Sequence, residues 1–328
     1  MTINIVYSLN DEYASGAACS IKSLCSNTHG TRDMVIYILF SELSNDNAVR
    51  FEQLSKECHV EIRLKKIKLE KHIAKNCFYT VNYLTCEMYF RMFIADILPK
   101  EEKALYLDCD TIITGDIVDL YMTDISDFIL GAVYDYPNIL REKELKQIEI
   151  DKESYFNSGV LLVNLKRFRE ENILERSLNY LKCHTELKCP DQDTLNIICD
   201  GKVKLLDERW NFQWGHCIDK FVFLNDEEAR KYKNIRDNFF LIHFTSPKKP
   251  WNSFVCPELG IFFWKYALDT PFKEILSINM IAKAPCSYLE DNIGHIINER
   301  FFTGKIGFKY IIKFFKSWLH HKVKKLRF

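Results

Sequence analysis

The sequence lacks any apolar run that approaches the roughly 18–20 residues needed to cross a bilayer as a helix. It also lacks a secretory signal pattern, because its start carries no cationic residue and the apolar run from Ile3 ends at Ser8. The 12 cysteines are scattered, with no C-x-x-C pair and no His-rich zinc spacing. Scattered cysteines in a chain of this length are typical of buried, reduced thiols. These absences predict a cytoplasmic protein.

Glycine-rich phosphate-binding signatures are absent as well. No G-x-G-x-x-G and no G-x-x-x-x-G-K-[ST] follows an expected strand, which argues against a dinucleotide dehydrogenase and a P-loop NTPase. A sugar nucleotidylyltransferase would need a glycine-rich loop with Arg or Lys after its first strand. The corresponding loop here, residues 8–14, contains two acids and no basic residue.

Acidic residues are missing from the last part of the sequence. Residues 301–328 contain eight Lys or Arg and no Asp or Glu, whereas residues 1–300 contain 37 basic and 45 acidic residues. An acidic body argues against nucleic-acid binding, and a basic tail favours an anionic partner of its own. On a helical projection the tail has an apolar face made by Phe308, Ile311, Ile312, Phe315 and Leu319. This pattern predicts a helix on an anionic membrane surface, with docking on the protein's own surface as the alternative.

The remaining sequence has the pattern of a large α/β protein. Apolar residues make up 47% of the 328, which is enough for a sizeable core. The expected strands are residues 3–8, 34–40, 60–67, 104–107, 128–134 and 159–165. The expected helices are residues 14–27, 45–58 and 84–98, and two more after Lys166 and Asp191. This alternation predicts a mainly parallel sheet flanked by helices, with ligands at the carboxyl ends of its strands.

Two carboxylates follow one of these strands, in the segment Asp108-Cys109-Asp110. In an extended chain, residues two apart lie on the same side, so the two side chains are expected to be neighbours. Like charges side by side are unfavourable unless a cation joins them, and Mg²⁺ or Mn²⁺ completed by phosphate oxygens is a natural solution. The alternative is a plain acidic loop, since Asp191-Gln192-Asp193 repeats the same triplet.

Three further segments have a functional and a structural interpretation. His243 ends an apolar run before Lys249, and it is either a structural histidine or the imidazole of a manganese site. Residues 155–159 contain Asn and Gly and are either a turn or part of a ligand pocket. Residues 190–194, with Pro and Asp, are typical of a helix start.

The order of these motifs resembles glycosyltransferase family 8, the retaining UDP-sugar transferases that include bacterial lipopolysaccharide galactosyl- and glucosyltransferases. The resemblance runs from Ile3 to about Trp251. It is carried by residues 6–13, 89–93, 105–110, 115–120, 156–165, 191–196, 206–211 and 243–251, in the family's order. Two positions depart from the family: Ser246 replaces a usual Gly, and Asn10 replaces a frequent Asp.

The resemblance implies a role for each matching residue. Asp108, Asp110 and His243 would hold Mn²⁺, or Mg²⁺, and Lys249 would help to neutralise the departing UDP. The implied donor-binding residues are Ser8, Asn10, Tyr13, Arg91, Asp108, Cys109, Asp110, Ser246 and Lys249. The implied catalytic pocket consists of Asp135, Asn157, Asp191 and Gln192. Because an amide is a poor nucleophile, Gln192 would stabilise an oxocarbenium-like state, and retention would proceed by front-face attack.

We therefore expect a GT-A type nucleotide-diphospho-sugar transferase fold over residues 1–255, a C-terminal helical extension over 256–300 and a basic, membrane-associating tail over 301–328. The expected function is transfer of galactose or glucose from a UDP-hexose to a glycan or lipid-linked acceptor in cell-surface polysaccharide synthesis. The expected location is the inner face of the cytoplasmic membrane. A non-catalytic or self-glycosylating UDP-sugar-binding protein is the alternative. A glycosidase would need two opposed carboxylates and no nucleotide site.

Overall fold

The computed structural model describes residues 2–29, 33–68, 85–135, 145–146, 148, 150–151, 153–214, 226–245, 247, 249–252 and 257–277. By contacts the chain divides into two compact units, Met1–Lys283 and Ala284–Phe328, and the second lies wholly outside the described residues. The predicted tail and most of the predicted helical extension therefore also lie outside them, as does Ser246. Among the residues described, no helix has both the length and the apolarity required to cross a membrane.

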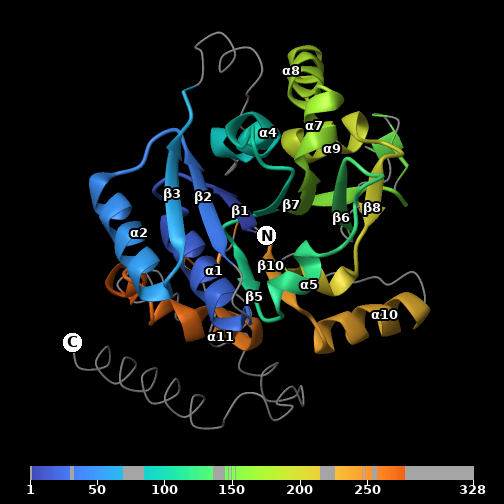
Figure 1. Ribbon diagram of the computed structural model, residues 1–328. Helices are drawn as coiled ribbons and strands as arrows, with labels where there is room; N and C mark the ends of the chain where they lie inside the picture. Colours follow the sequence, from blue (N-terminus) through green and yellow to red (C-terminus); the bar gives the residue numbers. More distant parts are fainter. Residues whose placement is uncertain are drawn as a thin grey trace, which may run out of the picture. The chain divides into compact units, whose positions relative to one another are not determined.

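A seven-stranded sheet forms the centre of the first unit (Figure 1). Its order is β3-β2-β1-β4-β7-β6-β8, and β7 is antiparallel to both of its neighbours while the other described pairs are parallel. The strands are β1 (Ile3–Ser8), β2 (Met34–Phe40), β3 (Glu61–Lys66), β4 (Lys103–Leu107), β6 (Leu130–Tyr134), β7 (Phe156–Asn164) and β8 (Val203–Leu205). The mainly parallel sheet predicted from the sequence is thus confirmed.

Both faces of the sheet are covered, because successive side chains of its central strands enter two different cores. In β4, Leu105 and Leu107 belong to one core, and Ala104 and Tyr106 belong to the other. Two groups of helices lie on these opposite faces (Figure 1). The first group is α1 (Ala14–Asn27), α2 (Asn45–Cys58) and α11 (Pro257–Ala267). The second group is α4 (Ile94–Ile97), α7 (Leu165–Glu170), α8 (Ile173–Cys183) and α9 (Pro190–Ile198).

A second, three-stranded sheet lies beside the end of β4 and was not predicted. It consists of β5 (Thr111–Ile113), β10 (Leu241–Phe244) and β9 (Phe212–Trp214), with β10 in the middle. These strands have only three or four residues and come from distant parts of the chain, so no local pattern indicates their pairing. Further described helices are α5 (Ile117–Tyr121), α10 (Asp226–Asp237) and a 3₁₀ helix, Glu208–Asn211.

The single helix predicted over residues 84–98 differs from the structure. A 3₁₀ helix, Cys86–Phe93, leads into α4, and Leu84 lies outside the described residues. Every side chain from Glu87 to Met92 is buried. Packing on all sides, rather than one apolar stripe, therefore determines the local geometry, and it carries Arg91 into the interior.

Candidate metal and donor-sugar site

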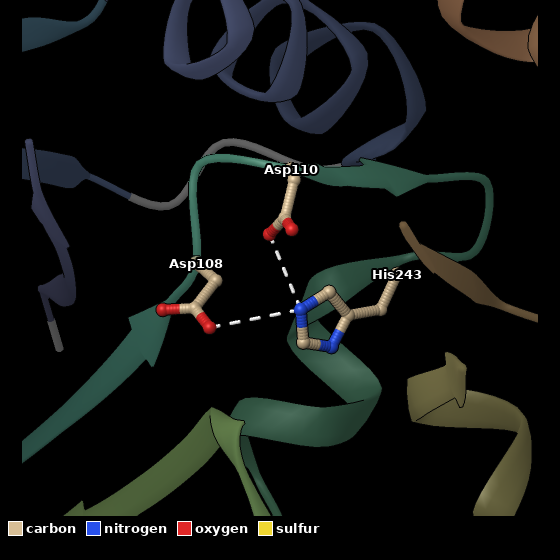
Figure 2. A group of neighbouring side chains, drawn as sticks. All are labelled: Asp108, Asp110 and His243. Atoms are coloured by element: carbon tan, nitrogen blue, oxygen red, sulfur yellow. Dashed lines mark ion pairs between the residues drawn. The ribbon is translucent and has the colours of Figure 1, made fainter. Parts of the chain in front are cut away.

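The two carboxylates and the imidazole converge at the carboxyl end of β4. Asp108 directly follows β4, Asp110 directly precedes β5, and His243 lies on β10, which pairs with β5. His243 Nε2 lies 3.2 Å from Asp110 Oδ1 and 3.6 Å from Asp108 Oδ2, and the ring points between the two carboxylates (Figure 2). One ligand atom from each residue lies within 4.8 Å of the others. Two carboxylate oxygens and one imidazole nitrogen form a donor set suited to Mn²⁺ or Mg²⁺.

A glycine on the neighbouring strand makes room for this group. The Asp108 N–H donates to the Gly159 carbonyl of β7 at 2.8 Å, so the two strands hold this turn together. A Cβ at position 159 would lie 2.6 Å from Asp108 Oδ2 and even closer to His243 Cε1. Only glycine allows the carboxylate and the imidazole to lie this close to the backbone of β7.

Asp110 and Lys249 form a buried ion pair beside the imidazole. The Lys249 ammonium donates to Asp110 Oδ2, and also to the Phe244 carbonyl at 2.7 Å. Burial alone would raise the pKa of the Asp110 carboxyl, but the charge of Lys249 holds that pKa well below its usual range. Asp110 is therefore an anion at neutral pH, as a metal ligand must be.

Arg91 forms an ion pair with Asp108, as Lys249 does with Asp110. Its guanidinium donates to Asp108 Oδ1 at 2.8 Å, and its Nε lies 3.2 Å from Asp191 Oδ2. It also donates to the Ser158 carbonyl at 2.6 Å and lies 4.6 Å from the centre of the Tyr106 ring. Burial raises the pKa of the Asp191 carboxyl, and the nearby guanidinium only partly offsets this effect. Arg91 thus joins the metal group to the first turn of α9.

Gln192 is held by hydrogen bonds at both ends of its amide. Its Oε1 accepts from Asn157 Nδ2 at 3.2 Å and from the Ser158 N–H at 3.0 Å. Its Nε2 donates to Asp135 Oδ2 and to the Tyr155 hydroxyl, both at 3.0 Å. The four residues predicted for the catalytic pocket therefore lie together, next to the metal group. Their side chains are neutral amides and carboxylates, which can hydrogen-bond sugar hydroxyls.

The end of β1 and the loop after it contain three of the predicted donor-binding residues, Ser8, Asn10 and Tyr13. The Ser8 hydroxyl lies 2.7 Å from the Tyr106 hydroxyl, which donates to Asp108 Oδ1 at 2.9 Å. Asn10 Oδ1 accepts the N–H groups of Glu12 and Tyr13 at 3.1 and 3.4 Å, and so closes the loop in a turn. The Tyr13 ring meets the Trp251 ring edge to face at 5.8 Å.

Cys109, another predicted donor-binding residue, lies between the two carboxylates in the chain. It is buried, and its Sγ donates to the Ser8 carbonyl at 3.2 Å. In this structure its side chain therefore holds the β1 loop against the turn after β4.

Comparison with known proteins decides the family. A model described as "Glycosyl transferase family 8" matches residues 4–254. The chain belongs to this family. It is thus a glycosyltransferase, and family 8 membership agrees with the resemblance inferred from its motifs.

The family 8 chain also resembles individual proteins. It is 27% identical to the lipopolysaccharide 1,2-glucosyltransferase of Escherichia coli K12 over 83% of its length and 79% of the relative. It is 26% identical to the lipopolysaccharide 1,3-galactosyltransferase of Salmonella typhimurium over 96% of its length and 91% of the relative. The galactosyltransferase LgtC, solved with donor and acceptor sugar analogs, superimposes with a TM-score of 0.70 at 23% identity, over 82% of this chain and 96% of LgtC. The predicted GT-A fold is thereby confirmed.

Sequence patterns missed several residues that contact the site. Tyr106, Ser158 and Asn211 hydrogen-bond to Asp108, Arg91 and His243 respectively. Tyr106 and Ser158 lie inside recognised segments, and Asn211 ends one, but none of these three positions indicates its hydrogen-bond partner. For the metal group, all three predicted ligands come together. The roles predicted for the donor-binding and catalytic residues stay predictions.

Proposed function

We propose that this family 8 enzyme transfers galactose or glucose from a UDP-hexose, with retention of anomeric configuration, in a reaction that depends on Mn²⁺ or Mg²⁺. One observation carries the proposal. Two carboxylates and an imidazole converge at 4.8 Å or less, directly beside a buried pocket of amides and carboxylates. The first group suits a cation bound to a diphosphate, and the second suits a sugar.

The residues of the metal group fit a divalent cation. Asp110 is ionised, the ring of His243 directs Nε2 at both carboxylates, and Gly159 leaves space beside them. When bound, the cation supplies positive charge for the diphosphate of the departing UDP. Lys249 already lies in the site and adds a second positive charge there, in a buried position where electrostatic interactions are strong.

The sugar pocket orients the donor and disfavours a covalent intermediate. Arg91 and Asp191 are positioned by each other, and Asp135 and Asn157 are positioned by Gln192. Side chains held in this way have fixed directions, as groups that bind sugar hydroxyls require. Gln192 is a neutral amide with both ends engaged, which makes it a poor nucleophile. We infer front-face attack, in which the acceptor hydroxyl gives its proton to a phosphate oxygen of the leaving group. Trapping of a covalent hexosyl–enzyme at Asp135, Asp191 or Gln192 would overturn this step.

The donor and the metal are tested together. UDP-galactose and UDP-glucose are each incubated with the protein and Mn²⁺, and release of UDP is followed with and without excess chelator. We expect one donor to be hydrolysed several-fold faster, and we expect chelator to stop the reaction. Asp110→Asn should abolish hydrolysis, whereas the matched surface variant Asp124→Asn should not. Full hydrolysis in excess chelator would contradict the metal assignment, and binding of UDP without turnover would favour the non-catalytic alternative.

The acceptor is proposed to be a glycan carried on a lipid at the inner face of the cytoplasmic membrane. Support comes from the two lipopolysaccharide glycosyltransferases above and from the basic sequence of residues 301–328. Deleting residues 301–328 should preserve hydrolysis of the UDP-hexose but weaken transfer to a lipid-linked acceptor. Flotation with anionic vesicles checks this, because equal binding of the full and shortened chains would contradict the membrane role.

A further inference from the structure

We propose that Asn211 is a positioning residue that selects the tautomer of His243, and so directs an unprotonated Nε2 at the two carboxylates. Asn211 is the last residue of the 3₁₀ helix Glu208–Asn211 and has no exposed surface. One end of its side-chain amide contacts His243 Nδ1 at 2.9 Å, and the other end contacts Asn157 Oδ1 at 2.9 Å. The inference rests on the proposed metal site, because the tautomer matters only if Nε2 is a ligand.

The direction of every hydrogen bond in this chain of amides follows from two backbone N–H groups. The Gly159 N–H donates at 3.0 Å to one end of the Asn157 amide, which must therefore be its oxygen. The other end of Asn157 is then a donor, toward Gln192. The Ser158 N–H donates to the same atom of Gln192 at 3.0 Å, which identifies that atom independently as an oxygen. A backbone N–H cannot reverse its role, so neither amide can rotate by half a turn without losing these bonds.

The direction of these hydrogen bonds also determines which end of Asn211 faces the imidazole of His243. The Asn157 oxygen can only accept, so the Asn211 atom that faces it must be the NH₂ group. The opposite end of Asn211 is then its oxygen, and it faces His243 Nδ1. An oxygen requires a proton on that nitrogen. In a neutral ring the proton on Nδ1 leaves a lone pair on Nε2, which lies between Asp108 and Asp110.

Without Asn211 the surroundings would favour the opposite tautomer. Asp110 Oδ1 lies 3.2 Å from Nε2, and an anionic oxygen at that distance attracts a proton to this nitrogen. A proton on Nε2 would occupy the lone pair that a cation needs. Asn211 opposes this effect by offering a buried acceptor to Nδ1. Second-sphere partners of this kind typically change metal affinity by about 10–100-fold.

The first test reads the tautomer without any metal. Protein labelled with ¹⁵N-histidine is studied free of metal at about pH 8.5, well above the usual imidazole pKa of about 6.5. Long-range ¹H–¹⁵N correlations then distinguish the two tautomers, and the signals of His243 are identified by their loss in His243→Gln. We expect the Nδ1–H form in the parent protein and an increased Nε2–H population in Asn211→Ala. The Nε2–H form in the parent would overturn the proposal.

The second test measures Mn²⁺ affinity by electron paramagnetic resonance in the presence of UDP. Asn211→Ala should weaken binding about 10–100-fold. Asn211→Asp should weaken it less, because a carboxylate also accepts the Nδ1 proton, although it cannot donate to the Asn157 oxygen as the Asn211 NH₂ group does. Asn196→Ala is the matched control. Asn196 is an equally buried amide, but it bonds only to Gln192 and Phe156 backbone groups, so its loss should lower thermal stability and leave Mn²⁺ affinity within about threefold.

The outcomes separate this inference from the function on which it rests. Unchanged Mn²⁺ affinity in a folded Asn211→Ala would overturn the positioning role. Absence of Mn²⁺ binding by the parent, together with the Nδ1–H tautomer, would instead contradict the proposed metal site while preserving the orientation of the imidazole. If Asn211→Ala does not fold, the parent tautomer and the affinity of Asn211→Asp still decide.

Discussion

The two sides of the candidate site are built on different physical principles. The charged side consists of Asp108, Asp110, Arg91, Lys249 and Asp191, and each charge has an oppositely charged partner within the site. The amide side consists of Asn157, Gln192 and Asn211, and it contains no charge of its own. Charge pairs are strong but costly to leave incomplete, whereas amides are oriented by fixed backbone groups. The comparison teaches that substitutions on the charged side should alter stability and metal binding together, while those on the amide side should alter orientation.

The largest effect is expected from Asp110→Ala on the charged side. Activity should fall by at least about 1,000-fold, because a ligand to the charge-stabilising cation is lost. Lys249 would remain buried without its main partner, so the free energy of unfolding should fall by about 3–5 kcal/mol. Calorimetry and a transfer assay measure the two quantities.

The double variant Asp110→Ala/Lys249→Met sharpens this result, because it removes both members of the pair. Stability should recover substantially, since an apolar replacement of a buried pair is often neutral, and activity should not recover. An Asp110→Ala protein as stable as the parent would show that the buried pair is not what holds Lys249.

Gly159→Ala should disrupt the metal group, because Gly159 lies against both Asp108 and His243. The added methyl group would meet both Asp108 and His243, so the metal group must spread apart. We expect Mn²⁺ affinity and transfer to fall by about 100-fold, comparable to the loss of a second-sphere partner. Gly201→Ala is the matched control, because a Cβ there meets nothing within 4 Å, although its φ of 70° makes alanine strained. Equal activity of the two variants would contradict the crowding.

Asp191→Asn should give a smaller effect and tests the charged side through pH. Burial raises the pKa of Asp191 in the folded state, so the protonated carboxyl contributes stability at low pH, and that contribution is lost as pH rises through the folded pKa. Asparagine mimics the neutral form at every pH. The variant should therefore be more stable than the parent at pH 7, and the difference should vanish below the unfolded pKa of about 3.8.

Urea unfolding at pH 3.5, 5 and 7 measures this difference. A variant less stable than the parent at pH 7 would mean that the ion pair with Arg91 outweighs the desolvation of the carboxylate. Transfer should fall about tenfold in the same variant, because a hydrogen-bonding group in the sugar pocket changes from acceptor to a mixed amide.

The sequence predicted the first elements of this fold, from β1 to α2, better than the contacts inside the site. β1, α1, β2 and α2 were predicted with the bounds that the structure has, because each is a long apolar or amphipathic run between polar loops. The ion pair of Lys249 with Asp110 joins residues 139 apart, and the bond of His243 to Asn211 joins residues 32 apart. Such pairs depend on β5, β9 and β10, which are too short to show a periodic pattern of apolar residues in the sequence. The order of the motifs predicted that Asp108, Asp110 and His243 would lie together. It did not predict which side chains would bond to them.

The smallest effect is expected from Asn10→Asp, which restores the residue frequent in the family. Asn10 Oδ1 accepts two loop N–H groups, and a carboxylate oxygen accepts the same bonds, so the turn should persist. The added charge lies beside Asp11, which already accepts from Ser44 and Asn47 at the start of α2. We expect kcat/KM for the UDP-hexose to change by less than about threefold, equivalent to roughly 0.6 kcal/mol. A loss of tenfold or more would show that the neutral amide of Asn10 itself reads the nucleotide base. The loop after β1 would then belong with the amide side, where orientation of hydrogen-bonding groups rather than charge determines what is bound.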